Sequence, residues 1–251
     1  MRLSGNTILV TGGGSGIGRG LAEALHGLDN QVIISGRRKG HLAATVEANP
    51  GMRSVELDVT DPTNIAAVIK KLTAEFPSLN VLINNAGIMM PDDAGGVIDD
   101  ELLVSTVTTN LLGPIRMTSA MIEHLKKQPY AAVINMSSVL GFVPLAMTAV
   151  YSSTKAALHS YTLSLRFKLR GTPVQVQEIA PPWVRTDLMN SNDAARAMPL
   201  KQFIEETMRA LGKDDEEVLV ERAKAMRSNP GPSEHALVTQ FNDAMAGNVP
   251  G

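Results

Sequence analysis

The chain has 251 residues, of which 44% are hydrophobic and 19% are charged, and its formal net charge is −2. A chain of this length and composition can bury a full core as a single α/β domain. The small negative charge gives no basic field for nucleic acid or an anionic membrane, and the absence of cysteine excludes disulfides, thiolate metal sites and a cysteine nucleophile.

The first predicted elements are a strand at 7–10, a glycine-rich turn at 11–18 and a helix that includes 21–25. Glycines in such a turn permit positive φ and let the backbone approach a pyrophosphate, while the helix N-terminus presents free N–H groups to it. The spacing is Gly-xxx-Gly-x-Gly, at the place in the chain where a first βα unit belongs. We therefore predict a dinucleotide-binding turn; a merely structural turn is the alternative.

The end of the second predicted strand indicates which dinucleotide is bound. In NAD-binding proteins an acidic residue here accepts a hydrogen bond from the ribose 2′-hydroxyl, and its charge repels a 2′-phosphate. This chain has Gly36 instead, followed by Arg37 and Arg38. A guanidinium contacts phosphate through two donors, so the sequence favours NADP(H), with NAD(H) as the second choice. The alternative is that both arginines only begin the next helix.

Short apolar runs continue along the chain and predict a parallel sheet covered on both faces. The predicted strands are 7–10, 31–34, 53–57, 81–84, 131–136 and 174–178. From Asp214 onward the pattern indicates two amphipathic helices within 214–246, separated by a turn at 229–232. We therefore expect an α/β fold with six parallel strands and no seventh, in one domain over residues 1–251.

Tyr151 and Lys155 are four residues apart in a predicted helix, and Ser138 lies thirteen residues before Tyr151. Positions i and i+4 share a helix face, so the phenol and the ammonium can point into one site. A neighbouring cation favours the ionised phenol, which lowers its pKa and makes it a usable acid or base. An ordinary helix surface is the alternative, because Tyr-xxx-Lys also occurs by chance.

Separated motifs along the chain follow one another in the order and spacing of a known family. They are Thr11-Gly12 with Gly16-Ile17-Gly18, the segment 84–87, Asn110, the segment 135–138, and Tyr151 with Lys155. Over nearly its whole length the chain resembles the short-chain dehydrogenase/reductase family, and 35–38 and 180–184 further resemble its DltE-like branch. The resemblance implies a doubly wound Rossmann-type sheet in the order 3-2-1-4-5-6.

For carbonyl reduction, the resemblance implies a catalytic group of four residues. Tyr151 is the general acid, and Ser138 hydrogen-bonds the substrate oxygen. Lys155 lowers the pKa of Tyr151 and holds the nicotinamide ribose. Asn110 bends its helix around a water that links Lys155 to solvent, with a plain polar helix residue as the alternative. Ser137 competes with Ser138, but the thirteen-residue interval favours Ser138.

The resemblance also implies cofactor contacts that extend from the glycine turn to the last predicted strand. Asp58 meets the adenine amino group, although an aspartate that caps the next helix is the alternative. Pro182 and Trp183 depart from the Pro-Gly that most members carry, so the loop must run differently there. The expected contacts are Gly12, Ser15, Gly16, Ile17, Gly18, Arg37, Arg38, Asp58, Val59, Asn84, Ala86, Gly87, Tyr151, Lys155, Val184 and Thr186.

The loops expected beside the nicotinamide are mostly apolar, which suits a hydrophobic carbonyl substrate. The segment 184–212 is expected to form a substrate loop and lid. The sequence thus predicts NADPH-dependent reduction of a hydrophobic ketone or aldehyde; the alternatives are a secondary-alcohol dehydrogenase and a nucleotide-sensing protein without catalysis. The expected substrate contacts, for each of which ordinary packing is the alternative, are Met89, Leu140, Phe142, Leu145, Trp183 and Met189.

Partners and location follow from similar reasoning. Family members commonly pair through the helix after Gly113 and the helix that carries Tyr151, and a second common interface uses a seventh strand. Because we expect no such strand, we predict a homodimer rather than a tetramer. No apolar run approaches the ~18 residues of a membrane span, so we expect a cytoplasmic protein without a membrane partner. The five histidines are far apart in the sequence, so we expect no metal.

Overall fold

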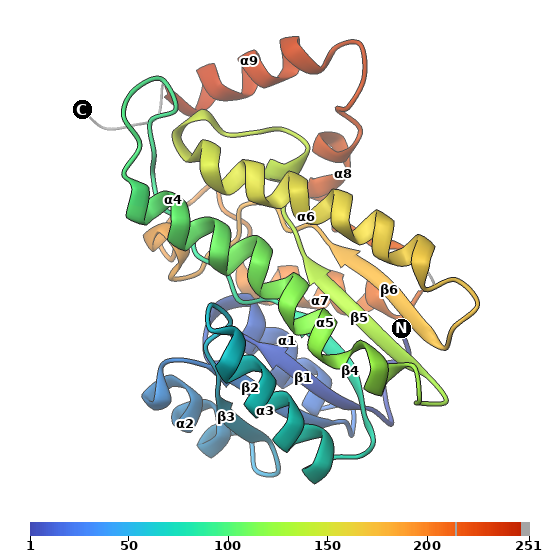
Figure 1. Ribbon diagram of the computed structural model, residues 1–251. Helices are drawn as coiled ribbons and strands as arrows, with labels where there is room; N and C mark the ends of the chain where they lie inside the picture. The colour runs from blue at the N-terminus through green and yellow to red at the C-terminus, as the bar shows by residue number, and fades with distance from the viewer. Residues whose placement is uncertain (214, 247–251) are drawn as a thin grey trace.

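The structure is a computed structural model, and it describes residues 1–213 and 215–246. Its parallel strands form one seven-stranded sheet in the order β3-β2-β1-β4-β5-β6-β7 (Figure 1). The order reverses between β1 and β4, so the carboxyl ends of these strands frame the crevice where doubly wound sheets bind ligands. The strands are β1 (Thr7–Thr11), β2 (Gln31–Gly36), β3 (Arg53–Glu56), β4 (Leu79–Asn84), β5 (Ala131–Met136), β6 (Val174–Ile179) and β7 (Glu217–Val218).

Helices connect successive strands, and short helical turns border the carboxyl edge of the sheet. Among residues 1–213 and 215–246, no helix combines the length with the apolarity that crossing a bilayer demands. The α-helices are α1 (Gly16–His26), α2 (Lys39–Ala48), α3 (Pro62–Glu75), α4 (Asp100–Val107), α5 (Gly113–Leu125), α6 (Ala149–Lys168), α7 (Leu200–Leu211), α8 (Glu221–Arg227) and α9 (Glu234–Ala246). The short turns are the π-helical η1 (Thr108–Leu112) and the 3₁₀ turns η2 (Val139–Gly141), η3 (Ala146–Thr148) and η4 (Leu188–Asn190).

The sheet separates two hydrophobic cores. α1, α2 and α7 pack on one face, and α3, α5 and α6 pack on the other (Figure 1). Along β1, Ile8 and Val10 face the α1 side, whereas Leu9 between them faces the α3 side. Burial on both faces explains why the central strands β1, β2, β4 and β5 read as mostly apolar runs, whereas the edge strand β3 is largely exposed.

The six predicted strands are present, with ends shifted by at most two residues. The expectation of six strands without a seventh was wrong, because β7 pairs in parallel with β6 through Glu178↔Glu217 and Ile179↔Val218. A strand of two residues is too short to show an alternating pattern, and its neighbours Glu216 and Leu219 are good helix formers. Of the predicted C-terminal helical segment, Asp214 lies outside the described residues, and the first helix begins only at α8.

Candidate active site

The glycine turn joins β1 to α1 at the carboxyl end of the sheet. Gly12 and Gly16 have φ of +67° and +52°, in the left-handed region that disfavours other residues. A Cβ on Gly12 would lie 2.9 Å from the Cα of Ala86, and one on Gly16 would lie 3.5 Å from the Thr186 side chain. α1 begins in this turn, so its N-terminal N–H groups and the positive end of its dipole lie where a pyrophosphate fits.

The loop after β4 is fastened to the glycine turn by two side chains that lie in the sequence motifs but were not among the expected site residues. Thr11 Oγ1 accepts hydrogen bonds from the backbone N–H groups of Asn85 at 3.0 Å and Ala86 at 3.1 Å, and Asn85 Nδ2 donates to the Thr11 carbonyl at 2.9 Å. Asn84, an expected cofactor contact, is buried and donates from Nδ2 to Asn135 Oδ1 at 2.9 Å. Its side chain therefore ties β4 to β5.

The end of β2 brings a cation to the glycine turn. Arg38 Nη2 donates to Ser15 Oγ at 2.7 Å, and both Arg37 and Arg38 are exposed. Ser15 is the N-cap of α1, and its side chain makes no capping bond to the helix. A guanidinium thus lies directly beside the predicted pyrophosphate site. From there it can hydrogen-bond a 2′-phosphate on the adjoining ribose.

Asp58 and Val59 lie in the loop between β3 and α3. Asp58 Oδ1 accepts from the N–H and the hydroxyl of Thr60 at 2.9 Å and 2.7 Å. Burial raises the pKa of Asp58, but the bonds from Thr60 and the charge of Arg37 outweigh it, so the pKa is lowered. The cap of α3 is Asp61, which accepts from two N–H groups of the first turn, so Asp58 is not the capping residue.

Ser138, Tyr151 and Lys155 meet at the end of β5. All three are buried; Ser138 follows β5, and the other two are one turn apart in α6. Tyr151 is hydrogen-bonded to Ser138, and Lys155 Nζ lies 5.4 Å from the centre of the Tyr151 ring. Nζ donates to the Met136 carbonyl at 2.8 Å, which anchors Lys155 to the last residue of β5.

Burial controls the protonation of both ionisable groups. It raises the pKa of Tyr151 to about 12, and the hydrogen bond with Ser138 offsets this only in part. It lowers the pKa of Lys155 to about 8, and the charge of Glu178 opposes that shift. The sequence predicts a lowered pKa for Tyr151; the structure differs because loss of solvation outweighs the hydrogen bond with Ser138. At neutral pH Tyr151 is therefore protonated, the form that donates a proton.

Asn110 lies in the π-helical turn η1 between α4 and α5. Its Oδ1 accepts from the N–H of Ile88 at 2.9 Å, and its Nδ2 donates to the carbonyl of the same residue at 2.8 Å. A Cβ on Gly87 would lie 3.3 Å from Asn110 Oδ1 and 3.8 Å from Lys155 Nζ. Single π turns often mark functional sites, and this one joins the loop after β4 to the surroundings of Lys155.

Ser137 and Ser138 have different partners. Ser137 donates from Oγ to Glu178 Oε1, on the side of β6. Ser138 Oγ accepts from the N–H of Leu140 at 3.1 Å and is bonded to Tyr151. The geometry therefore supports Ser138, rather than Ser137, as the residue that meets a substrate oxygen.

The expected substrate side chains differ in exposure. Phe142 and Leu145 are buried within the loop that precedes α6. Trp183 is 45% exposed, so it is the expected contact with the most surface free to meet a ligand. The remaining expected contacts, all half-buried, are Met89, Leu140 and Met189.

The segment 184–212 is held in place by contacts within itself and with the sheet core. Val184 forms a parallel bridge with Met198, and the Arg185 guanidinium donates to two carbonyls of the same segment, from Ala194 and Ala195. α7 packs on the α1 side of the sheet, where Phe203 is buried in the core. This segment therefore closes the α1 side of the fold, and movement over substrate stays a prediction.

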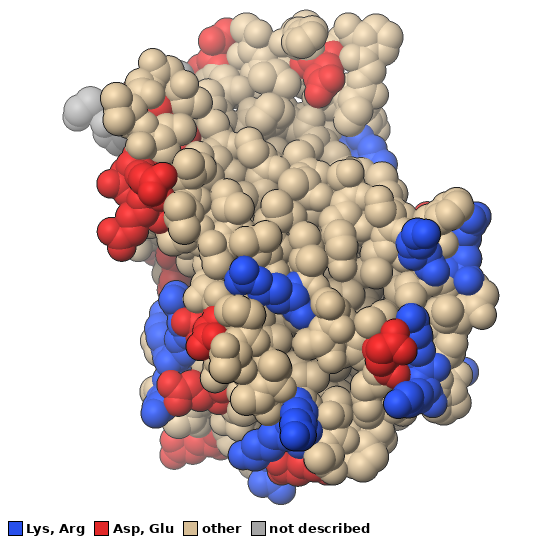
Figure 2. Space-filling model, in the orientation of Figure 1, with Lys and Arg blue, Asp and Glu red and all other residues tan. Residues whose placement is uncertain are grey.

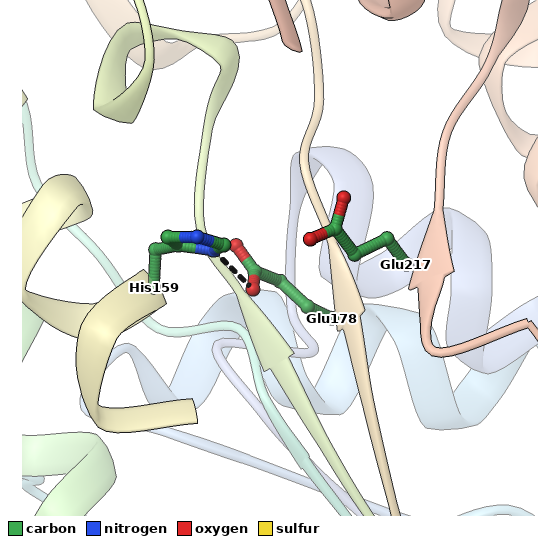
Figure 3. Close-up of side chains that lie close together, drawn as sticks. All are labelled: His159, Glu178 and Glu217. Atoms are coloured by element: carbon green, nitrogen blue, oxygen red, sulfur yellow. Dashed lines mark hydrogen bonds and ion pairs between the residues drawn. The ribbon is translucent and has the colours of Figure 1, made fainter. Parts of the chain in front are cut away.

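An ionic cluster lies beside the site and was missed by sequence reasoning. His159 of α6 is bonded through Nδ1 to Oε2 of Glu178 at 2.8 Å, and Glu217 of β7 lies next to them (Figure 3). Glu217 accepts two bonds from Arg227 of α8, at 2.6 Å and 2.8 Å. One signal was present in the sequence, because Glu178 is an acidic residue inside a predicted buried strand.

Comparisons with known proteins agree with this geometry. A family profile described as short chain dehydrogenase matches residues 6–197. The chain is 37% identical over 249 residues to the "Uncharacterized oxidoreductase DltE" of Bacillus subtilis, a match that covers 96% of this chain and 98% of that protein.

Solved structures of similar proteins contain nicotinamide dinucleotides. A short chain dehydrogenase from Burkholderia cenocepacia in complex with NADP has a TM-score of 0.85 and 26% identity, and covers 96% of this chain and 99% of its own. A 3-ketoacyl-(acyl-carrier-protein) reductase from Brucella melitensis complexed with NADH has a TM-score of 0.75 and 25% identity, over 81% of this chain and 89% of its own.

Proposed function

This chain belongs to the short-chain dehydrogenase family, and we propose that it reduces a hydrophobic ketone or aldehyde to an alcohol with NADPH. It is an NAD(P)H-dependent oxidoreductase. The observation that carries the proposal is Tyr151, a buried phenol that is protonated at neutral pH, bonded to Ser138 and one helix turn from Lys155. A carbonyl oxygen that gains negative charge needs such a donor.

The proposed chemistry assigns one task to each side chain. The Ser138 hydroxyl donates a hydrogen bond to the carbonyl oxygen and fixes its position. Tyr151 transfers its phenolic proton to that oxygen, while bound NADPH supplies the hydride to carbon. Lys155, protonated below its pKa of about 8, stabilises the tyrosinate that forms and binds the nicotinamide ribose. Asn110 shapes the helix and loop beside Lys155, where we propose that a water returns the proton.

The residues present fit NADP(H). The glycine turn and the N-terminus of α1 suit the pyrophosphate, and Arg38, held at Ser15, suits the 2′-phosphate. Gly36 offers no carboxylate to repel that phosphate. NAD(H) remains the second cofactor, because one structural relative is complexed with NADH. The other proposed contacts are Asp58 and Val59 at the adenine, Ala86 and Gly87 at the adenosine ribose, and Val184 and Thr186 at the nicotinamide carboxamide.

We propose a hydrophobic substrate because the side chains around the predicted nicotinamide site are mostly apolar. Trp183 offers an exposed aromatic surface, and Met89, Leu140 and Met189 are half-buried. Such walls gain affinity by burying apolar surface and offer few anchors to a sugar or a carboxylate.

We also propose that the enzyme is a homodimer paired through α5 and α6. The face over these helices carries few charged side chains (Figure 2). Exposed apolar side chains on this layer include Leu103 and Val104 of α4 and Leu163 and Phe167 of α6. An apolar surface of this kind is typical of the core of a homodimer interface.

The experiment that tests the function follows NADPH and NADH consumption at the nicotinamide absorbance. The substrates are aryl ketones, 1,2-diketones, β-keto esters and aldehydes. We expect turnover that is faster with NADPH than with NADH, and faster with apolar than with charged carbonyl compounds. Tight NADPH binding without turnover of any carbonyl compound would count against reduction and favour oxidation of a secondary alcohol or nucleotide sensing.

A further inference from the structure

Glu178 is a buried carboxylate at the centre of the ionic cluster beside the active site. Its side chain is 1% exposed. Ser137 Oγ donates to Oε1. His159 Nδ1 approaches Oε2 at 2.8 Å, as the dashed line in Figure 3 marks. An ionised carboxylate only accepts hydrogen bonds, so His159 carries its proton on Nδ1. Both carboxylate oxygens therefore have a donor, as a buried charge requires.

The partners of Glu178 lie next to the proposed catalytic residues. Ser137 immediately precedes Ser138 at the end of β5. On α6, Tyr151, Lys155 and His159 are spaced four residues apart and thus share one helix face. Glu178 therefore joins β6 to the end of β5 and to α6. These two elements carry Ser138 and Tyr151 and set the distance between the Ser138 hydroxyl and the Tyr151 phenol.

Glu178 also supplies negative charge beside a buried ammonium. Lys155 is 4% exposed, and its Nζ donates to a neutral carbonyl rather than to a carboxylate. Burial lowers the pKa of Lys155 to about 8, and Glu178 is the charge that raises it. Without the negative charge of a carboxylate at this position, burial would lower the pKa of Lys155 further, and Lys155 would lose its proton at a lower pH.

The other groups packed around Glu178 are already paired among themselves. Glu217 of β7 binds Arg227 of α8 through both oxygens, and Arg227 lies over the Phe142 ring at 4.7 Å. Arg166 of α6 binds the carbonyls of Val176 and Glu216. His159, Glu178 and Glu217 have ligand atoms within 4.8 Å of one another, a spacing that suits a metal ion. Both carboxylate oxygens of Glu217 already accept hydrogen bonds from Arg227, however, so a metal ion would have to displace the Arg227 guanidinium.

We propose that Glu178 is a positioning residue for the reaction: through Ser137 and His159 it orients the ends of β5 and α6, and its charge keeps the Lys155 ammonium protonated. The proposal rests on the proposed reductase function, because its main readout is the pH profile of that reaction.

The experiment measures kcat/KM for NADPH-dependent carbonyl reduction from pH 6 to pH 10 in the wild type and in Glu178→Gln. In the wild type we expect the rate to fall as the pH rises through about 8, where Lys155 loses its proton. In Glu178→Gln we expect this fall about one pH unit lower. The matched control is Glu216→Gln, a neighbouring exposed acid, which should leave the profile in place. An unchanged profile in folded Glu178→Gln would overturn the proposal.

Glu178→Asp separates charge from geometry. It keeps the carboxylate but shortens its reach to Ser137 and His159, so we expect the wild-type pH profile with a lower kcat. If Glu178→Gln does not fold, Glu178→Met provides a second neutral variant. If neither folds, Glu178→Asp decides, because wild-type kcat would contradict the positioning role.

NADPH affinity, measured by fluorescence titration at pH 7 and pH 9, is a readout independent of turnover. Because Lys155 is the proposed ribose contact and its pKa should fall from about 8 by about one unit, we expect Glu178→Gln to bind NADPH about two-fold more weakly than the wild type at pH 7 and both proteins to bind weakly at pH 9. If the wild type binds NADPH but reduces no carbonyl compound, the proposed function fails, and this titration still tests Glu178. In that case, a Glu178→Gln affinity for NADPH equal to that of the wild type at both pH values would refute the role of Glu178.

Discussion

At the residue scale, the neighbours of a side chain decide whether it can perform chemistry. Tyr151 and Tyr161 both lie on α6, and burial raises the pKa of both. Tyr161 is bonded to Thr118 of α5, whereas Tyr151 is bonded to Ser138 beside Lys155. A protonated phenol is therefore common to both positions, and only Tyr151 has the partners that proton transfer to a substrate needs.

Replacement of Tyr151 by Phe removes the proposed acid and retains the ring. We expect kcat for carbonyl reduction to fall at least about 100-fold, since general acid catalysis contributes this much or more. The measurement is steady-state NADPH oxidation, with NADPH binding as a check that the site is intact. Tyr161→Phe is the matched control and should retain the wild-type rate. A Tyr151→Phe variant that kept most of its activity would contradict the assignment.

Arg38 is the residue on which cofactor choice depends. Arg38→Ala should weaken NADPH binding roughly 10-fold to 100-fold, because a hydrogen bond to a charged group contributes about 1.5–3 kcal/mol. NADH binding should change little, since NADH has no 2′-phosphate. Lys39→Ala is the control: Lys39 is a neighbouring cation that pairs with Glu56 at 3.0 Å. Equal losses for NADPH and NADH would show that Arg38 only supports the loop.

The residues that sequence reasoning selected and those that it passed over differ in how their partners are arranged. Asn110, Ser138, Tyr151 and Lys155 were predicted because they occur in short motifs with regular spacing. Glu178 was not selected, since its partners Ser137 and His159 lie far from it in the sequence and only the fold brings them together. The raised pKa of Tyr151 could not be predicted either, because it depends on burial.

At the element scale, the N-terminus of the catalytic helix is capped from another part of the chain. Thr148, the N-cap residue of α6, makes no side-chain capping bond. The Asp92 carboxylate instead accepts from the N–H groups of Ala149 at 3.0 Å and Val150 at 2.9 Å. A carboxylate at a helix N-terminus satisfies free donors and complements the dipole. It therefore holds the turn of α6 that carries Tyr151.

Asp92→Ala should loosen this turn. We expect a loss of about 1 kcal/mol in the free energy of unfolding, the usual effect of removing a cap, together with a lower kcat because Tyr151 is less firmly placed. Chemical denaturation and steady-state kinetics measure the two effects. Asp93→Ala is the control, since Asp93 is exposed and its carboxylate accepts from the N–H of Gly95 in its own turn. Similar behaviour of the two variants would show that the cap does not position Tyr151.

β7 shows what the sequence pattern of an element leaves open. The six longer strands have at least four residues each and were predicted to within two residues of their ends. β7 is defined by its pairing with β6 and by burial of Val218, and both are tertiary properties. Helix propensity in 216–224 predicted a helix instead of this strand. Tertiary contacts overrode that propensity, which is only a weak guide to local structure.

At the scale of the whole molecule, the distribution of apolar surface bears on assembly. The sequence-based argument for a dimer over a tetramer assumed that no seventh strand exists, and β7 removes that premise. The remaining argument is physical. β7 offers only two residues for pairing between chains, whereas the layer of α4 and α6 exposes Val104, Leu163 and Phe167, the last with 61% of its surface. Pairing through the helices would bury far more apolar surface.

We therefore expect light scattering after size exclusion to give a mass of two chains of 26.8 kDa. The double variant Leu163→Glu with Phe167→Glu should shift the mass to one chain, because two carboxylates on each side would lose their solvation in the interface. Leu28→Glu is the control, since Leu28 is an exposed apolar residue in the turn after α1. A wild-type mass of four chains would mean that a second surface also pairs. A double variant that stayed dimeric would move the interface away from α6.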